Sequence, residues 1–466
     1  MVEIQLKNKN TFWVWNNDID FQKRGDVAYW FPSNSAIKNL SHKLSEVAKL
    51  SNLKFSPNHN RSDEFFYIDI SNINTSNGSY EKTRIKNANA PSRARKKIEW
   101  LDIIVSTVRP NRNATSIILE DADDLVCSTG FAVLKAIKIN PYYLFVFTKT
   151  VSFIEQLVRQ TSATMYPAVN ENDILNVRLS VPSQKNQQKV EEIVKEVFQL
   201  KREAEEEIQE AKNIFLQNIK TYISDWAILT TETKKTFWLW SNQVDISNRI
   251  DPDYYSGEGL KNRLGKTKPL ANLVEMKIGK TPTFDDYLPS GNRRIMKFRA
   301  ITGQGIDLEN EERGFVKEGF FQKNKQNKIE KNDIVLGSAA HQAHYIGKHI
   351  DIVDELPQEF LDGILTVAEI MTIRAREAIN PFVLLLFLRS DVGYEIIQRQ
   401  IKGQTSHLYP KDMAGIEIPE AIIKISKSEA GKKIESKIKS SLEKSRLSRQ
   451  KLQEAKDFVE NLFKKV

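Results

Sequence analysis

Cysteine is almost absent from this sequence, and long apolar runs are missing. The single cysteine, Cys127, excludes a disulfide framework and any zinc ribbon or finger built on cysteines. The longest apolar stretch, Phe382–Leu388, is far shorter than the roughly 20 residues that a membrane span requires. The N-terminal segment has no basic region followed by an apolar run, so we expect no signal peptide. These absences predict a cytoplasmic protein.

Signatures of catalysis are missing as well. No phosphate-binding Walker sequence occurs, and Gly303-Gln-Gly305 lacks the third glycine of a dinucleotide-binding loop, which indicates a turn. Asn140-Pro141-Tyr-Tyr superficially resembles the Asn-Pro-Pro-Tyr loop of amino-methyltransferases, but a helix N-cap is the better interpretation. His341 and His344 could bind a metal only with further ligands, and none can be identified. We therefore predict a non-catalytic chain that holds no cofactor and no metal.

Length and charge set the remaining bounds. The 466 residues suggest two to four domains, and 40% hydrophobic with 28% charged residues is an ordinary balance for a folded protein. Lys and Arg number 69 against 60 Asp and Glu, a net charge of +9. This modest excess permits a polyanionic partner without establishing one.

An internal repeat is the most informative pattern. Thr11–Trp15 (Thr-Phe-Trp-Val-Trp) returns at 236–240 as Thr-Phe-Trp-Leu-Trp, and further matches follow in the same order. These pair Leu44–Val47 with Leu270–Leu273, Asp102–Val105 with Asp333–Leu336, Ile139–Pro141 with Ile379–Pro381, and Gln160–Ser162 plus Tyr166–Pro167 with Gln404–Ser406 plus Tyr409–Pro410. The spacing between matches grows from 225 to about 244 residues, as insertions into a duplicated module would produce. We predict two copies of one domain.

A long helical segment is expected at the end of each copy. Residues 186–220 contain no Gly or Pro, and residues 432–465 follow Gly431. The apolar positions that form a heptad-like seam are Val190, Ile193, Val197, Leu200, Ala204, Ala211 and Ile214 in the first segment and Ile434, Ile438, Leu452, Ala455, Val459 and Leu462 in the second, where Ser441, Ser445 and Arg449 weaken the middle. Each helix could pack on its own domain. We predict instead an antiparallel pair, with Val190 near the Leu462 end and Ile214 near the Ile434 end.

Short β-branched or aromatic runs between the helices indicate strands. Examples are Phe65–Ile70 and Ile103–Val105 in the first copy and Ile334–Leu336 in the second. The predicted fold class is α+β, with two repeated globular domains, two long helices forming an antiparallel coiled coil, and pseudo-two-fold symmetry. The expected domains are 1–185, a helical spacer at 186–222, a linker and second domain at 223–427, and a second spacer at 428–466.

Basic residues cluster in corresponding parts of the two copies. Nine lie between Glu81 and Arg112, and ten lie between Lys261 and Arg299, interleaved with Asn, Ser, Thr and Gln. A solvated charged face is the simplest explanation for one such cluster, but matched clusters favour contacts with phosphates and base edges. The candidate DNA contacts are Arg84, Arg93, Arg95, Arg109, Arg112, Thr161 and Ser162 in the first copy and Arg293, Arg294, Lys323, His341, Gln342, Thr405 and Ser406 in the second.

Several short strings carry a resemblance to a known family. They are Ile68-Asp-Ile70, Ala90–Arg95, Asp102–Ser106 with Val108-Arg-Pro110, Cys127–Phe131, Ile278-Gly279 with Thr281-Pro282, Asp333–Ser338, and the edges Val181-Pro182 and Ile418-Pro419 before each helix. In this order the chain resembles the specificity (S) subunits of Type I restriction–modification systems. The resemblance covers nearly the whole chain, as recognition domain, helix, recognition domain and helix.

The resemblance implies recognition of a bipartite target in double-stranded DNA, with one domain on each half-site and the helices as a spacer. The implied partners are two methyltransferase subunits, which carry the S-adenosylmethionine, and the restriction motor-nuclease subunits of a full complex. Alternatives are a specificity subunit of another restriction–modification or phage-defence class, a self-contained DNA-modifying enzyme, and a coiled-coil scaffold that binds no nucleic acid.

Overall fold

The computed structural model describes residues 40–60, 62–121, 124–161, 167–224, 226, 263–308, 314–360, 362–401 and 406–464. The chain divides into two compact units, which we call unit 1 (residues 1–199 and 447–466) and unit 2 (residues 200–446). Each long helix contributes residues to both units, and the four-part division expected from the sequence stays a prediction. The matched Phe-Trp segments at 11–15 and 236–240 lie outside the described residues.

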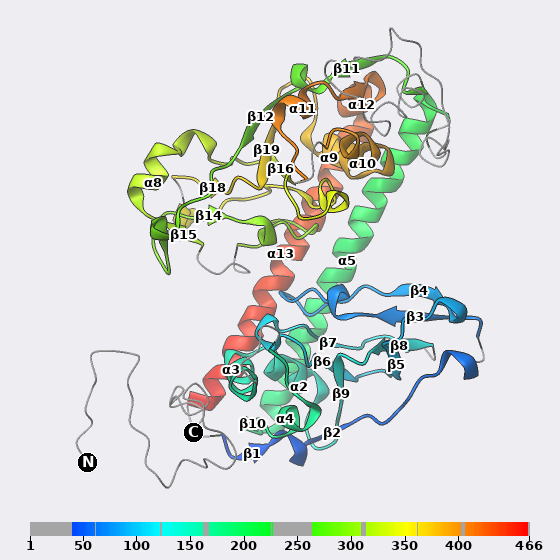
Figure 1. Cartoon of the computed structure of the whole chain (residues 1–466), viewed down its shortest axis with the longest axis vertical. Coiled ribbons are helices and arrows are strands. Elements are labelled where there is room, and N and C mark those ends of the chain that lie inside the picture. Colours follow the sequence, from blue (N-terminus) through cyan, green and yellow to red (C-terminus); the bar gives the residue numbers. More distant parts are fainter. Residues whose placement is uncertain are drawn as a thin grey trace. The chain divides into compact units, whose positions relative to one another are not determined.

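Unit 1 contains short strands followed by helices (Figure 1). Its strands are β1 (His42–Lys43), β2 (Ala48–Leu50), β3 (Glu64–Ile68), β4 (Thr83–Lys86), β5 (Ala94–Lys97), β6 (Ile103–Ser106), β7 (Thr115–Ile117), β8 (Leu125–Ser128), β9 (Phe131–Ala136) and β10 (Arg178–Leu179). Its helices are α2 (Pro141–Thr148), α3 (Val151–Gln160), α4 (Glu171–Leu175), the start of α5 (Gln184–Tyr222) and the end of α13 (Glu429–Lys464).

Two four-stranded sheets form the centre of unit 1, in the orders β2-β9-β6-β7 and β4-β3-β8-β5. All of β6 is buried, and its side chains alternate between two cores, as the two-residue period of a strand requires. Ile103 and Val105 belong to the core that also includes α2, whereas Ile104 packs with Ile68 and Cys127 of the other sheet. The first sheet therefore lies between helix α2 and the second sheet.

Unit 2 is likewise built from short strands and helices. Its strands are β11 (Thr267–Pro269), β12 (Val274–Ile278), β13 (Tyr287–Leu288), β14 (Ile295–Met296), β15 (Phe315–Val316), β16 (Ile334–Gly337), β17 (Ile350–Ile352), β18 (Leu365–Thr366), β19 (Ile370–Ala375) and β20 (Glu417–Pro419). Its helices are α8 (Glu318–Lys323), α9 (Pro381–Arg389), α10 (Asp391–Gln398), α11 (Pro410–Ala414), α12 (Glu420–Ser426), the end of α5 and the start of α13.

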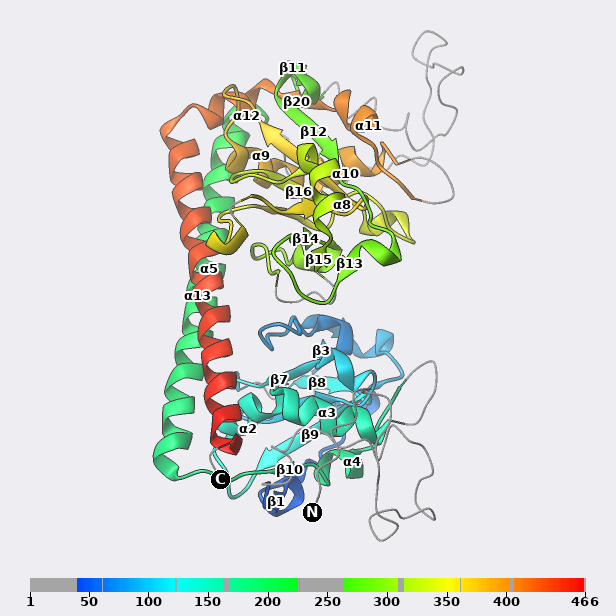
Figure 2. The same cartoon turned by 90° about the vertical axis from the view of Figure 1, so that its left-hand side faces the viewer.

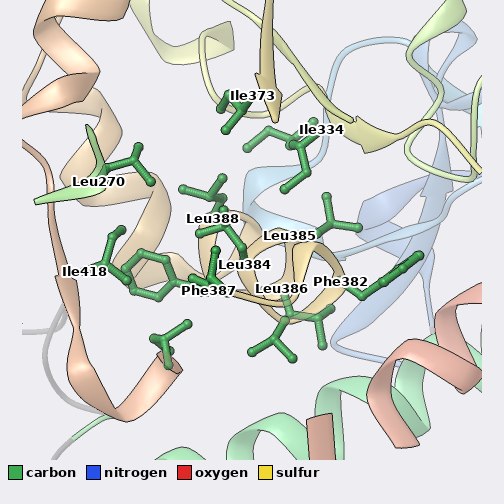
Figure 3. Close-up of a cluster of buried hydrophobic side chains, with 14 of the residues drawn as sticks. Leu270, Ile334, Ile373, Phe382, Leu384, Leu385, Leu386, Phe387, Leu388 and Ile418 are labelled. Carbon is green, nitrogen blue, oxygen red and sulfur yellow. The ribbon is translucent and has the colours of Figure 1, made fainter. Parts of the chain in front are cut away.

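The core of unit 2 gathers around α9. Every residue from Phe382 to Leu388 is buried, which explains why the longest apolar run in the sequence is a central helix. Figure 3 shows the α9 leucines together with Ile334 and Ile373 of the sheet and with Leu270 and Ile418. In the part of the chain that the structure describes, no helix combines the length and the apolar character needed to cross a membrane.

The two long helices pack against each other in opposite directions within each unit. In unit 1, Val190 at the start of α5 shares a core with Val459 and Phe463 at the end of α13. In unit 2, Ile214 and Phe215 near the end of α5 share a core with Ile434 at the start of α13. Figure 2 shows these segments side by side. The predicted antiparallel packing is confirmed in both units, because the start of one helix meets the end of the other.

The buried seam of α5 differs from the predicted one at alternate positions. Val194 and Phe215 are buried, whereas Ile193 and Ile214 are only partly buried. Ser441, one of the residues expected to weaken α13, contributes a hydrogen bond instead, and Ser448, which was not selected, does the same. Ser441 Oγ donates to the carbonyl of Ala204 at 2.7 Å, and Ser448 Oγ donates to that of Val197 at 3.0 Å. Small side chains at these points allow the backbones to approach closely.

The internal repeat is confirmed by the sheets. The order β2-β9-β6-β7 of unit 1 recurs as β12-β19-β16-β17 in unit 2, with antiparallel pairing throughout. The buried Asp102 pairs with Lys135 of β9, and the buried Asp333 pairs with Arg374 of β19. Packing partners as well as strand order were therefore retained after duplication.

The Asn-Pro pairs fulfil matching roles. Asn140 and Asn380 cap α2 and α9, each accepting from the next two free backbone N–H groups, as predicted. The amide of Asn140 also donates to Glu191 of α5 at 2.6 Å, and that of Asn380 donates to Glu435 of α13 at 2.7 Å. Each N-cap therefore fixes its sheet-covering helix against one long helix.

One of the predicted repeat matches is wrong. Tyr409–Pro410 starts helix α11, whereas Pro167 lies before the segment that bridges to Val108. The helix equivalent to α11 is α4, which follows Asn170. Both caps form a capping box with an aspartate three residues later. Pro167 and Pro410 both follow a tyrosine in the sequence, but the two prolines lie in different local structures.

Candidate nucleic-acid interface

The connection between β6 and β7 carries two of the candidate arginines of unit 1. A 3₁₀ turn spans Pro110–Arg112, and its flanking residues Arg109 and Asn113 both have a left-handed backbone with φ of +50°. The segment after α3 supports this turn. Arg109 N–H donates to the Pro167 carbonyl at 2.7 Å, and Val169 N–H donates to the Thr107 carbonyl at 2.9 Å. Arg112 is exposed, and Arg109 is partly exposed.

A buried lysine fixes the base of this turn. Lys149, at the end of α2, is 3% exposed, and its ammonium donates to the carbonyls of Asn113 at 3.2 Å and Thr75 at 3.0 Å. The amide of Asn113 in turn donates to the Thr148 carbonyl at 3.2 Å. Burial, with a smaller contribution from the Lys456 charge, lowers the pKa of Lys149 to about 7. The arginine turn is therefore attached to the helix that covers the sheet.

Arg93 joins the same end of unit 1. The Arg93 carbonyl accepts from Thr129 N–H at 2.9 Å. The residue after Thr129, Gly130, accepts through its carbonyl from Thr107 N–H at 2.8 Å. Thr107 leads directly into the β6–β7 connection, so the structure brings Arg93, Arg109 and Arg112 onto neighbouring loops. Arg93 and the nearby Arg95 are both exposed.

Arg84 and Thr161 are not on the loops that carry Arg93, Arg109 and Arg112. Arg84 lies on β4, at the opposite edge of the second sheet from β5, where it pairs with Glu64 at 2.5 Å. Thr161 follows α3 and its hydroxyl donates to the Val158 carbonyl at 2.6 Å, which is a helix-ending contact. Ser162 lies outside the described residues.

The β16–β17 connection of unit 2 occupies the place of the β6–β7 turn. Ala340 N–H donates to the Ser406 carbonyl at 3.2 Å, and Leu408 N–H donates to the Ser338 carbonyl at 2.8 Å, as in unit 1. His341 and Gln342 follow directly and are both exposed. Ser406 is 6% exposed, and the hydrogen bond that it accepts from Ala340 is made by its backbone carbonyl. Thr405 lies outside the described residues.

Helix α10 holds the far part of this connection. Tyr394 Oη donates to the His344 carbonyl at 2.8 Å, and the Gln398 amide donates to the carbonyls of Ala343 and Ile346 at 3.1 and 2.6 Å. The connection also presents Tyr345, an exposed aromatic residue that the sequence reasoning did not select. Its position directly after His344, in a predicted polar loop, was the available signal.

Three further candidates of unit 2 lie around β14 and α8. Arg293 pairs with both Glu318 and Asp362. Arg294 is 5% exposed, with its guanidinium 4.6 Å from the ring centre of Phe315, and it donates to the Leu308 carbonyl. Lys323 is exposed at the end of α8. Only Lys323 of these three presents a largely exposed cation.

Other chemistry finds little support in the described residues. Burial raises the pKa of the Cys127 thiol to about 12, so it remains protonated and unreactive at neutral pH. No group of three or more His, Cys, Asp or Glu within the described ranges has a geometry suited to a metal ion.

Comparison with known proteins gives these loops a context. A family model described as the Type I restriction modification DNA specificity domain matches residues 37–211, which include the β6–β7 turn. Residues 37–211 are thus similar to this specificity domain. The specificity subunit of the Type I restriction enzyme HindI from Haemophilus influenzae is 28% identical over 137 residues. The match covers 28% of this chain and 27% of that relative, so it spans about a quarter of either protein.

Solved structures with similarity to this chain include two crystal structures. The HsdS subunit from Thermoanaerobacter tengcongensis is 21% identical, with 89% of this chain and 95% of that one covered and a TM-score of 0.31. The S subunit of a Type-I restriction-modification system from M. genitalium is 13% identical, with 91% and 95% covered and a TM-score of 0.35.

Proposed function

We propose that the whole chain is a DNA specificity subunit that recognises a bipartite target, with one half-site bound by each unit. The observation that carries this proposal is the matched pair of supported loops. The β6–β7 turn and the β16–β17 connection leave equivalent sheets, have equivalent backbone partners, and present different polar side chains. Two copies of one frame with different loops suit two half-sites of different sequence.

The side chains divide by the DNA groups that they suit. Arginine pairs with guanine edges and glutamine with adenine edges in the major groove, whereas lysine and arginine also bind phosphates without regard to sequence. We assign base contacts to Arg109 and Arg112 in unit 1 and to His341 and Gln342 in unit 2. Arg95 and Lys323 are assigned to phosphates because both are exposed cations.

The chain is proposed to act without catalysis, as an adaptor for catalytic subunits. Its expected partners are two methyltransferase subunits that carry S-adenosylmethionine and, in a full complex, restriction motor-nuclease subunits. The antiparallel packing of α5 with α13 in each unit supports a role as spacer between half-sites and as a docking surface. A duplicated chain suits two copies of one partner, because each copy of the module offers the same frame.

Selection from a library of random duplex DNA by the full chain tests the DNA proposal. We expect a motif of two short blocks separated by a gap of constant length. The double variant Arg109→Ala/Arg112→Ala should lose preference in one block only, whereas Arg178→Ala, which removes an exposed cation from β10, should leave both blocks unchanged. A wild-type chain that selects no motif, in the presence of competitor DNA, would identify a scaffold that does not bind DNA specifically.

The spacer role has a separate test. Inserting seven residues into both helices, after Gln199 and before Leu447, lengthens the pair by about 10 Å at 1.5 Å per residue. At about 3.4 Å per base pair, the selected gap should grow by roughly three base pairs. Recovery of the original gap by the lengthened chain would contradict the spacer role without affecting the assignment of the base contacts.

A further inference from the structure

The turn before β9 in unit 1 carries Gly130, whereas the equivalent turn before β19 in unit 2 carries the charged Glu369. In unit 1, Gly130 accepts from Thr107 N–H, and the preceding residue, Thr129, donates its N–H to the Arg93 carbonyl. In unit 2, the Glu369 carbonyl accepts from Ser338 N–H at 2.8 Å, and the preceding residue, Ala368, donates its N–H to Thr281 Oγ1 at 3.1 Å. The same turn of the same sheet therefore neighbours Arg93 in unit 1 and Thr281 with Glu369 in unit 2.

Glu369 is placed beside the β16–β17 connection and is exposed. Its Oε2 accepts a hydrogen bond from Thr281 Oγ1 at 3.1 Å, so the hydroxyl that receives the Ala368 N–H also orients the carboxylate. Ser338, which bonds to the Glu369 backbone, precedes His341 by three residues. A negative charge is thus held at the base of the loop to which we assign base contacts.

A carboxylate at such a position has a restricted set of partners in DNA. Phosphates carry negative charge and repel it, so it weakens binding to DNA in general. An exocyclic amino group on a base edge is a hydrogen-bond donor, and the N4 amino group of cytosine is the donor that Asp and Glu accept from in the major groove. Gly130 at the corresponding place in unit 1 has no side chain and makes no such contact.

We propose that Glu369 is a specificity-determining residue of unit 2 that recognises the N4 amino group of a cytosine. This inference rests on the proposed function, because it requires that the β16–β17 connection faces DNA. The hydrogen bond from Thr281 orients the carboxylate, and its charge penalises every site that lacks an amino donor there. Glu369 therefore raises specificity while it lowers affinity for DNA of unrelated sequence.

The test compares Glu369→Gln with wild type in the full chain. We expect the preference for cytosine at one position of the unit 2 half-site to fall by about 5- to 150-fold, the range of one good base contact. Binding to duplex DNA of unrelated sequence should instead become about two-fold tighter at low salt, because one repulsive charge is removed. A purely structural role of Glu369 would not change these two quantities in opposite directions.

Two further variants complete the test. Glu377→Gln removes the same charge from an exposed residue beyond the other end of β19, and it should leave the selected motif unchanged. Thr281→Val removes the orienting hydroxyl and should relax the same position less than Glu369→Gln does. An unchanged motif in Glu369→Gln, or an equal change in Glu377→Gln, overturns the assignment of Glu369. Absence of any motif for the wild-type chain overturns the proposed function itself.

Discussion

Unit 1 and unit 2 build the same four-stranded sheet, yet the loop that leaves β6 carries arginines, whereas the loop that leaves β16 carries histidine, glutamine and tyrosine. The backbone hydrogen bonds that support the two loops are equivalent. Buried groups such as Asp102 and Asp333 have stayed in place, whereas exposed loop residues have changed. The comparison indicates that packing preserves the frame and that the loops are free to diverge in the DNA contacts that we propose for them.

The largest expected difference between the units concerns their buried aspartates. Asp333 accepts two hydrogen bonds from Arg374, both at 2.8 Å, whereas Asp102 lies 3.4 Å from Lys135. Asp333→Asn should lower the free energy of unfolding by about 3 kcal/mol, because it removes the buried charge that accepts two hydrogen bonds from Arg374 and leaves that arginine with the more exposed Glu330 as its ion-pair partner.

Asp102→Asn is the matched control for this change. Burial raises the pKa of Asp102, and its single lysine partner, Lys135, lies 3.4 Å away, so its charge is less well compensated than that of Asp333. Its loss should therefore cost no more than about 1 kcal/mol. Urea unfolding of the two full-length variants compares the values, and equal losses would show that the two ion pairs contribute alike.

The second difference lies in the loops. Arg109→Ala/Arg112→Ala and His341→Ala/Gln342→Ala should each relax only one block of the selected motif, by about 1–3 kcal/mol for each base contact removed. Affinity measured over a range of salt concentrations separates the two kinds of contact. A variant that loses a phosphate contact shows a salt slope smaller by about one and binds all sequences less tightly. Relaxation of both blocks by either variant would contradict the division of the target between units.

The third difference depends on pH. The cation at the end of α2 is Lys149, whereas the end of α9 carries Arg389, which binds the Ile350 carbonyl and Asp351. With a native pKa of about 7 for Lys149, the unfolded chain holds one more proton than the native chain between pH 7 and about 10. Stability should therefore rise with pH across this range, by at most about 1.4 kcal/mol per pH unit.

The control for this prediction is Lys149→Met, which removes the titrating group and retains most of the side-chain volume. The difference in unfolding free energy between wild type and this variant, measured by urea unfolding from pH 7 to pH 9, should move in favour of wild type as the pH rises. A difference that does not vary with pH would mean that Lys149 titrates alike in the folded and unfolded chains.

The smallest expected effect comes from the serines of α13. Ser441→Ala and Ser448→Ala each remove one hydrogen bond to a carbonyl of α5, but alanine is the better helix former. The net loss should be about 0.5 kcal/mol for each variant. Thermal unfolding of the single variants checks this value, and a gain in stability would show that helix propensity outweighs the hydrogen bond.

Local patterns in the sequence predicted much of the frame. Asn140-Pro141 and Asn380-Pro381 cap helices because an asparagine side chain and a proline need only their immediate neighbours to act. The repeat of Asp102–Val105 as Asp333–Leu336 predicted equivalent strands, since a buried strand must keep its apolar residues. Long-range contacts were not predictable in the same way. The partners of Lys149 come from residues 75 and 113, and no local pattern brings these together.

The candidate residues show the same limit. Arg109, Arg112, His341 and Gln342 lie on loops between strands, where residues of that kind were expected, and their DNA contacts stay predictions. Arg294 was chosen for its charge, but the structure covers it with Phe315 and places it beside the Leu308 carbonyl. Charge can be read from a sequence, whereas burial depends on segments that are distant along the chain.

Unit 1 is discontinuous along the chain, and this has a consequence for its biosynthesis. Residues 447–466 belong to it, and Phe463 packs against Phe147 with ring centres 5.7 Å apart. Unit 2 is one continuous segment, so a ribosome finishes it before unit 1 has received its last helical turns. Domains usually complete folding in the order in which they are synthesised, but here the unit that begins first is completed last. Until then Val190, Val194 and Val197 lack the α13 residues that bury them, so the nascent chain exposes an apolar stripe on which a chaperone can act.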